Sequence, residues 1–299
     1  MKNAIVIGAN GFIGSELVKE LNNNGYFVYA LTHKNEYSVN NNVKNIECPM
    51  NDVENVVGLP STVDYLFDAS WIGTSGVSRG DLDLQLKNVK WRSKVIRLCK
   101  RLNCRYIGFG SMMELESIQS TFFDESRPQI ESIYSHSKYM AHAVSKAMAV
   151  DLDVDYVWGK ITNSYGPGEH SARLINMVIR KVITNEVPIF SSGSQYYDFI
   201  YISDLVKAFR LMAEKGKSFT DYTLSSGSPK KLRAYLEEMN NLIAPDMNFI
   251  FKESSDCSKN IDVSSYSANK IITDTGFTSS VSFSEGIMKT YTWIQNNFN

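Results

Sequence analysis

The segment Gly8-Ala9-Asn10-Gly11-Phe12-Ile13-Gly14 follows the apolar run Ala4–Ile7 and opens a helical pattern that continues to Leu21. Glycines in such a place allow a tight turn and let the backbone approach a pyrophosphate closely. The helix that follows offers free N–H groups and the positive end of its dipole to the same anion. The stretch predicts a strand, a phosphate-binding loop and a helix, although a glycine-rich turn without a ligand would have the same pattern. The residues expected to contact a dinucleotide are Gly8, Asn10, Gly11, Phe12, Ile13 and Gly14.

Short apolar runs and helical patterns alternate through the first half of the chain. Further strands are expected at 27–31, 43–48, 64–67, 106–109 and 155–161, and helices at 82–102 and 134–149. Strands that alternate with helices form βαβ units and a parallel sheet covered on both faces. We therefore expect an α/β protein with a Rossmann-type, doubly wound parallel sheet. Such sheets bind ligands beyond the carboxyl ends of their strands.

After Gly166-Pro167-Gly168 the alternation loosens, and helices mix with serine-rich loops. Helices are expected at 173–184, 203–214, 232–242 and 283–296, and a short strand at 187–190. This pattern predicts a smaller mixed α/β lobe in the C-terminal part of the chain.

The composition argues against several other classes of protein. In 299 residues, 31 Lys and Arg are balanced by 32 Asp and Glu, so the chain lacks the basic field of a nucleic-acid binder or a polybasic membrane binder. No apolar run reaches the roughly 18 residues that span a membrane, and the N-terminal run meets Gly8 too early for a signal peptide. Four cysteines without CxxC spacing and four histidines predict neither a disulfide framework nor a metal site. We expect a cytoplasmic protein.

A second motif lies in the expected helix 134–149. Tyr134-Ser135-His136-Ser137-Lys138 places a tyrosine and a lysine four residues apart, on one face of a helix. An ammonium beside a phenol stabilises the phenolate and lowers the pKa of the tyrosine toward neutrality. The tyrosine could then exchange a proton with a substrate at physiological pH. Alone, the pattern is common, and it also fits an ordinary exposed tyrosine and lysine.

The order and spacing of these motifs resemble the extended branch of the short-chain dehydrogenase/reductase superfamily, the nucleotide-sugar epimerases, dehydratases and reductases. The glycine pattern GxxGxxG, the pair Gly110-Ser111 at a strand end and the YxxxK motif occur in the family's order. The resemblance implies that Ser111, Tyr134 and Lys138 are catalytic. Ser111 would polarise the substrate carbonyl or alkoxide. Tyr134 would transfer the proton, and Lys138 would tune Tyr134 and bind the nicotinamide ribose.

Further matches extend the resemblance from residue 1 to about 297. Asn88 stands at the family's helical asparagine, where the alternative is a plain surface residue. Asn163 begins a segment, 163–168, that resembles one lining the nicotinamide and the sugar in the family. It is a candidate substrate contact, or else a loop-capping asparagine. Asp198 and Asp204 match an aspartate pair that orders a loop and caps a helix.

The resemblance also implies a division into two units. The dinucleotide-binding Rossmann domain would comprise 1–166 plus about 198–225, and the substrate-binding lobe about 167–197 and 226–299. A homodimer would form through the helices 82–102 and 134–149.

Three positions depart from the family's pattern. Tyr197 stands where relatives often have a phosphate-binding arginine. Arg173 becomes the candidate substrate contact in its place, unless it is a solvated helix arginine. Pro49 replaces an aspartate that often contacts adenine, and Asp68 stands where many relatives have histidine. These changes affect nucleotide recognition and leave the expected fold unchanged.

The end of the second strand indicates which dinucleotide is bound. NAD sites carry an Asp or Glu there, which accepts hydrogen bonds from the ribose 2′-hydroxyl. Here the strand ends in Leu31-Thr32-His33-Lys34, and no acidic residue occurs before Glu36. Thr32, His33 and Lys34 could hold a 2′-phosphate instead. NADP(H) is therefore the preferred cofactor, and NAD(H) is the alternative.

Dehydration of a sugar is excluded by the residues that follow Ser111. The family's dehydratases have Asp-Glu there, whereas this chain has Met112-Met113, which cannot transfer protons, and Glu114 comes one position late. We therefore expect NADPH-dependent reduction of a 4-keto-6-deoxy nucleotide sugar in deoxysugar or surface polysaccharide biosynthesis. The alternatives are an NAD-dependent nucleotide-sugar 4-epimerase and a redox-inactive dinucleotide sensor on the same fold. The intact set of Ser111, Tyr134 and Lys138 counts against the sensor.

Overall fold

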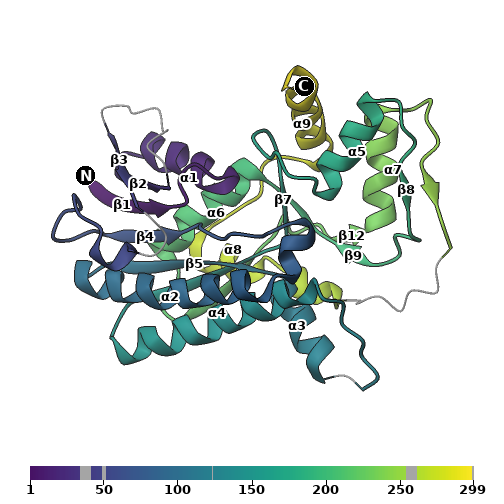
Figure 1. Cartoon of the computed structure of the whole chain (residues 1–299). Helices are drawn as coiled ribbons and strands as arrows, with labels where there is room; N and C mark the ends of the chain where they lie inside the picture. The colour runs from purple at the N-terminus through teal and green to yellow at the C-terminus, as the bar shows by residue number, and fades with distance from the viewer. Residues whose placement is uncertain (34–41, 49–51, 123, 254–260, 298–299) are drawn as a thin grey trace.

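The computed structural model describes residues 1–33, 42–48, 52–122, 124–253 and 261–297. One large sheet is flanked by helices, and a smaller group of helices and short strands lies beyond one end of it (Figure 1).

Within the described residues, seven strands form one sheet in the order β11-β6-β5-β4-β1-β2-β3, and every neighbouring pair is parallel. After β1 the chain forms β2 and β3 on one side, and it then continues with β4 on the other side of β1. This reversal is the topological switch point of a doubly wound sheet and confirms the expected Rossmann-type fold. The bounds are β1 Lys2–Ile7, β2 Tyr26–Thr32, β3 Val43–Glu47, β4 Tyr65–Asp68, β5 Arg105–Ser111, β6 Tyr156–Ile161 and β11 Thr220–Leu224.

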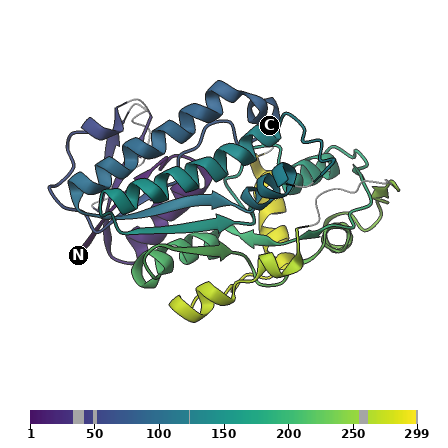
Figure 2. The same cartoon turned by 90° about the horizontal axis from the view of Figure 1, so that it is seen from below.

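Helices cover both faces of the sheet (Figures 1 and 2). On one face α1 packs against α6, and on the other α2 packs against α4. The bounds are α1 Phe12–Asn23, α2 Leu82–Leu102, α4 Ser132–Asp151 and α6 Ile202–Lys215.

The continuous apolar run of strand β1 contributes side chains to two hydrophobic cores. Successive side chains of a strand point to opposite faces, so a strand buried on both sides serves two cores. Ala4 and Val6 belong to the core that contains the apolar side chains of α1 and α6. Ile5 and Ile7 belong to the core that contains those of α2.

The smaller assembly lies near the carboxyl ends of the strands (Figure 1). Helices α5 and α7 both pack against α9, while α8 packs against α6 and β11. Their bounds are α5 Leu174–Ile183, α7 Leu232–Ile243, α8 Asn269–Thr275 and α9 Phe283–Asn297. Short strands pair in twos: β7 Asn163–Tyr165 with β10 Phe199–Tyr201, β8 Ile189–Phe190 with β13 Ile250–Phe251, and β9 Tyr196–Tyr197 with β12 Lys230–Lys231.

The loops at the carboxyl ends contain helical segments of their own. Helix α3, Met113–Phe122, follows β5 directly, and the sequence analysis did not predict it. Three 3₁₀ turns lie in the described residues: η1 Val53–Asn55, η2 Gly76–Gly80 and η3 Val263–Tyr266.

Candidate active site

The loop between β1 and α1 has the shape that a pyrophosphate needs. Gly8 has a φ of +76°, and an added Cβ would lie 3.1 Å from the backbone of Ala69 and Ser70. At Gly14 an added Cβ would collide with the Gly8 carbonyl. Gly11 is the N-cap of α1 and makes no side-chain cap, so the first N–H groups of the helix can face an anion. The loop therefore fits the dinucleotide expected from the sequence.

The end of β2 is described only in part. Thr32 is buried and His33 is exposed. Lys34 and Glu36 lie outside the described residues, as does Pro49. The expected contacts of Thr32, His33 and Lys34 with a 2′-phosphate therefore stay a prediction.

A cavity of about 530 Å³ opens at the carboxyl ends of the strands. Ser111 ends β5, while Tyr134 and Lys138 lie one turn apart on α4, and all three line the cavity. Asn163, at the start of β7, and Arg173, just before α5, line the same cavity. The fold thus brings together five candidate residues that are far apart in the sequence.

The catalytic candidates form part of the cavity wall. Tyr134 and Lys138 have exposed fractions of 7% and 5%. Lys138 Nζ donates a hydrogen bond to the Phe109 carbonyl at 3.0 Å and lies 3.8 Å from the centroid of the Trp71 ring. It lies 6.0 Å from the centroid of the Tyr134 ring. The Ser111 hydroxyl accepts a hydrogen bond from the Met113 N–H at 3.2 Å.

The pKa of Tyr134 differs from the sequence expectation. Burial raises the pKa of this phenol above its ordinary value, and the Glu114 carboxylate adds to the rise. The guanidinium groups of Arg173 and Arg79 lower the pKa, and so does a hydrogen bond with Ser111, but together they do not cancel the effect of burial. Tyr134 is therefore a protonated phenol, ready to donate.

The pKa of Lys138 is shifted strongly in the other direction. Burial lowers it from 10.5 to about 7, and the positive charge of Arg92 contributes, while the carboxylates of Glu114 and Asp68 oppose the change. A lysine with a pKa near 7 exists in both protonation states at neutral pH. Perturbed pairs of this kind are typical of catalytic sites.

Two residues that the sequence analysis missed complete the wall around Tyr134. The Arg79 guanidinium lies 4.7 Å from the centroid of the Tyr134 ring, and Trp71 meets that ring edge-on at 5.9 Å. Both belong to the loop between β4 and α2. Gln85 holds this loop, because it accepts a hydrogen bond from Trp71 Nε1 at 2.8 Å and donates one to the Gly73 carbonyl at 2.8 Å. The only sequence signal was an aromatic residue just after a strand end.

Asn88 is neither a surface residue nor a cavity residue. Its exposed fraction is 0%. Its Oδ1 accepts from the Ile72 N–H at 3.0 Å, and its Nδ2 donates to the Ile72 carbonyl at 2.8 Å. Asn88 thus fixes the loop that contains Trp71 from within.

Arg173 brings a cation to the cavity, and Tyr197, which stands where the family often has an arginine, lies there too. Both side chains line the cavity. Arg173 Nε lies 3.7 Å from Glu169 Oε2, and the arginine side chain is 38% exposed. Asn163 Nδ2 donates to the Asp198 carbonyl at 3.1 Å, which fixes the amide beside the cavity.

The two aspartates of the 198–204 segment are structural, in different ways. Asp198 is fully buried, accepts from the Thr162 hydroxyl at 3.0 Å and accepts from both the N–H and the hydroxyl of Ser226. The expectation that Asp204 caps α6 is wrong, because the N-cap residue of this helix is Tyr201. Its carboxylate instead accepts hydrogen bonds from the segment near α9, namely from Ser279, Ser280 and Val281.

Asp68, which replaces a histidine of the family, forms a buried ion pair under the cavity. Arg92 Nε lies 3.1 Å from Asp68 Oδ2, and both side chains are at most 1% exposed. The Arg92 guanidinium also lies 5.0 Å from the centroid of the Trp71 ring. The pair therefore supports the loop that forms the wall beside Tyr134.

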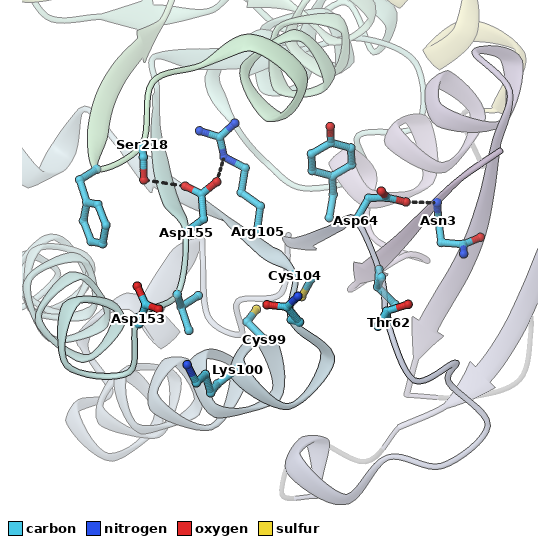
Figure 3. A pocket seen from close by; sticks show the side chains of 15 residues that line it. Asn3, Thr62, Asp64, Cys99, Lys100, Cys104, Arg105, Asp153, Asp155 and Ser218 are labelled. Atoms are coloured by element: carbon cyan, nitrogen blue, oxygen red, sulfur yellow. Dashed lines mark hydrogen bonds and ion pairs between the residues drawn. The ribbon is translucent and has the colours of Figure 1, made fainter.

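A second hollow, of about 640 Å³, lies at the opposite edge of the sheet, where the strands begin (Figure 3). An ion pair lies in its wall: Arg105 Nε lies 3.2 Å from Asp155 Oδ2, and Ser218 donates to Asp155 Oδ1 at 2.6 Å. Asp64 Oδ2 accepts from the Asn3 N–H at 2.7 Å. None of the candidate catalytic residues lines this hollow.

The described part of the chain contains no group of three or more His, Cys, Asp or Glu that could hold a metal ion. None of the helices described is both long and apolar enough to cross a membrane.

The fold and the cavity define a Rossmann-type enzyme that uses a nicotinamide dinucleotide. The profile of the NAD dependent epimerase/dehydratase family matches residues 4–225, and the chain belongs to this family.

Similar proteins include a synthase and a putative epimerase. The chain is 25% identical to "CDP-abequose synthase" of Salmonella typhimurium over 257 residues, which cover 83% of each chain. It is also 25% identical to a "Putative UDP-glucose 4-epimerase" of Methanocaldococcus jannaschii over 311 residues, 98% of each chain. Among solved structures, the Bordetella bronchiseptica enzyme WbmF in complex with NADH superimposes with a TM-score of 0.81 at 22% identity, over 99% of this chain and 92% of that one.

Proposed function

We propose that the protein catalyses NADPH-dependent reduction of a 4-keto-6-deoxy nucleotide sugar. The observation that carries the proposal is the make-up of the cavity around Ser111. Ser111, Tyr134 and Lys138 meet there, whereas Met112 and Met113 bring apolar thioethers to the wall where a dehydratase needs an acid–base pair. The similarity to CDP-abequose synthase supports a nucleotide-sugar substrate.

The residues of this chain would protonate the carbonyl oxygen of the substrate. When bound, the reduced nicotinamide supplies the hydride. Tyr134 gives its phenolic proton to the oxygen as negative charge develops there, and the Ser111 hydroxyl holds the same oxygen. A phenol whose pKa is raised is in the form that a reduction requires. Lys138 binds the nicotinamide ribose and restores the proton of Tyr134.

The remaining cavity residues would hold the substrate. Arg173 would bind a phosphate of the nucleotide diphosphate and Asn163 would contact the sugar, which their positions in the cavity wall support. Met112 and Met113 suit a deoxygenated C6 methyl group better than a hydroxyl, because a buried hydroxyl without a partner costs free energy. This part of the cavity would favour 6-deoxy sugars.

The main test is the stoichiometry. The protein is incubated with keto sugars made in situ by a dehydratase, in the dTDP, CDP, GDP and UDP series, and absorbance is followed at the NADPH band. We expect one NADPH consumed per keto sugar and no activity on the parent hexose. NADPH that stays untouched in all four series, with a parent UDP-hexose epimerised, would contradict the proposal.

The preference for NADPH is tested separately by titrating NADPH and NADH and following cofactor fluorescence. We expect tighter binding of NADPH, and Lys34→Ala should weaken NADPH binding while leaving NADH binding unchanged. Equal or tighter binding of NADH to the wild-type protein would show that Thr32, His33 and Lys34 do not hold a 2′-phosphate.

The second candidate is an NAD-dependent 4-epimerase. The similarity over 98% of both chains to the putative UDP-glucose 4-epimerase favours it. An epimerase oxidises and re-reduces its own substrate, so tightly held NAD released from purified protein supports it. Empty or NADP-loaded protein supports the reductase.

We further propose that the lobe at 167–197 and 226–299 binds the substrate, since Arg173, Tyr197 and Tyr266 enter the cavity from it.

We also propose a homodimer through α2 and α4. The exposed apolar side chains on these helices support it: Leu82, Leu86, Tyr139, Met140 and Val144. Light scattering should report a dimer that Val144→Glu dissociates; a wild-type monomer would contradict this.

A further inference from the structure

A chain of polar groups leads from the candidate catalytic serine, through the buried Glu114, to the outer edge of the sheet. The Ser111 N–H donates to Glu114 Oε1 at 2.8 Å, and Glu114 Oε2 lies 2.9 Å from His142 Nδ1. His142 Nε2 lies 3.2 Å from Asp221 Oδ1, which also accepts from Lys146 Nζ at 3.0 Å. The groups come from β5, α3, α4 and β11, so the chain crosses four elements.

Two glycines in β5 leave the space that the Glu114 carboxylate occupies. A Cβ at Gly110 would collide with Trp158 Nε1 and Glu114 Oε1, and a Cβ at Gly108 would collide with the Trp158 ring. With glycine at both positions, Trp158 Nε1 donates to Glu114 Oε1 at 3.1 Å, and Glu114 is only 2% exposed. A carboxylate this deep needs partners that stay in place.

His142 provides the charge that balances this carboxylate. Its two ring nitrogens both face carboxylate oxygens, which only accept hydrogen bonds, and only the imidazolium donates from both nitrogens. Its ring stacks on Trp158, with 4.5 Å between centroids and 7° between planes. Burial opposes protonation, but the hydrogen bonds to Asp221 and Glu114 raise the pKa of His142 above its ordinary value of 6.5.

The other groups that face His142 do not replace that charge. Strand β6 contributes Trp158 and Tyr156. The hydroxyl of Tyr156 forms a hydrogen bond with the Ser145 hydroxyl, and burial raises the pKa of Tyr156 well above its ordinary value. On α4, Lys146 is engaged with Asp221. If the imidazole lost its proton, one carboxylate oxygen would face a nitrogen lone pair, and the buried Glu114 would lose its cation.

We propose that His142 is a positioning residue for the reaction of the candidate active site, acting through Glu114 on the backbone of Ser111 only while it carries its proton. This inference rests on the proposed function for its kinetic readout. Glu114 holds the N–H of Ser111 at the point where β5 turns into α3. It also acts on the pKa values of both Tyr134 and Lys138. A loosened Glu114 would displace the Ser111 hydroxyl and change the proton balance beside it.

Two variants on α4 form the kinetic test. His142→Gln keeps a neutral hydrogen-bonding side chain and removes the charge. His136→Gln is the matched control, because His136 lies on the same helix and contacts the Ser132 carbonyl and the Thr121 hydroxyl instead. We expect His142→Gln to lower kcat about tenfold, the effect of a small misplacement, with KM for the keto sugar and affinity for NADPH unchanged. In its pH profile, the part of the alkaline fall of kcat that comes from His142 should be missing, while the part that comes from Lys138 stays.

A variant His142→Gln with wild-type kcat and pH profile would overturn the proposal, and so would an equal loss in His136→Gln. If the wild-type protein reduces no keto sugar, the proposed function fails, and the same variants are compared on epimerisation, which would use the same Ser111.

The protonation of His142 is tested without any substrate, by following the ¹⁵N shifts of its ring against pH by NMR. We expect titration above pH 6.5 in the wild-type protein and at lower pH in Glu114→Gln. Titration at or below 6.5 in the wild-type protein would overturn the proposal even if the enzyme is an active reductase.

Discussion

At the edge of the sheet where the strands begin, several polar groups have partners within the hollow. Asp155 is shared by Arg105 and Ser218, and Asp64 accepts from the backbone of Asn3 (Figure 3). At the opposite edge, cations gather around a tyrosine instead. Arg79 lies against the ring of Tyr134, and the charges of Arg79 and Arg173 both act on its pKa.

This difference indicates which of the two hollows is suited to catalysis. Both edges carry a hollow of similar size, so volume alone does not identify the active site. Polar groups that already bond one another, such as Arg105, Asp155 and Ser218, have few hydrogen bonds left for a ligand. A hollow in which burial shifts the pKa of a tyrosine and a lysine in opposite directions is prepared for proton transfer.

The largest expected effect is at the carboxyl edge. Tyr134→Phe keeps the ring against Trp71 and Arg79 and removes the hydroxyl that carries the proton, so kcat should fall by about 10²–10⁴, the usual contribution of general acid catalysis. Cofactor affinity should stay nearly intact. Steady-state kinetics and an NADPH titration check both, and a variant with wild-type kcat would remove Tyr134 from the mechanism.

Lys138→Met should lower both kcat and cofactor affinity, because Lys138 is proposed to restore the proton of Tyr134 and to bind the ribose. The matched control is Lys100→Met, which removes a lysine from the hollow at the other edge. We expect the control to bind NADPH like the wild-type protein. Unchanged NADPH affinity in Lys138→Met would contradict the ribose contact.

At the amino edge the expected effect is on stability alone. Arg105 donates to the carbonyls of Ala213 and Gly216 and pairs with Asp155, with only 12% of its side chain exposed. Arg105→Met leaves these acceptors unpaired, so the free energy of unfolding should fall by about 1–3 kcal/mol. Urea unfolding measures this change. A loss of kcat in the still-folded variant would show that the two edges are not independent.

The smallest expected effect is the pH dependence of stability. The folded pKa of His142 is raised, so its contribution is fully present below the unfolded value of 6.5 and is lost as pH rises through the folded pKa. Asp221 has a lowered pKa, so its contribution is present above 3.8 and is lost as pH falls. Urea unfolding from pH 5 to 9 should show the loss at His142 as a difference between the wild-type protein and His142→Gln, because Lys138, whose lowered pKa acts in the opposite direction, is common to both. Parallel curves for the two proteins would contradict this.

The parts of the fold and the site that local spacing determines could be predicted from the sequence. The Gly8–Gly14 turn and the one-turn separation of Tyr134 and Lys138 are of this kind. The pKa of Tyr134 was predicted in the wrong direction, because desolvation depends on what covers the ring and not on the residue four positions away.

Other features depend on contacts between distant segments. Arg79 and Trp71 reach the cavity because Gln85 and Asn88 hold their loop from the next helix. Helix α3 and the inward position of Glu114 depend on glycines in β5 and on Trp158 in β6. No motif records such a combination.

The two buried aspartates of the 198–204 segment also set the order in which the protein can mature on the ribosome. Asp198 bonds Ser226, 28 residues later, and Asp204 bonds Ser279, Ser280 and Val281, 75 to 77 residues later. The large sheet is complete once β11 has emerged, but Asp204 must wait for the segment 279–281 before its carboxylate is satisfied. The cavity needs Ile261 and Tyr266 for its wall, so it too is completed only after the strands of the large sheet have been made.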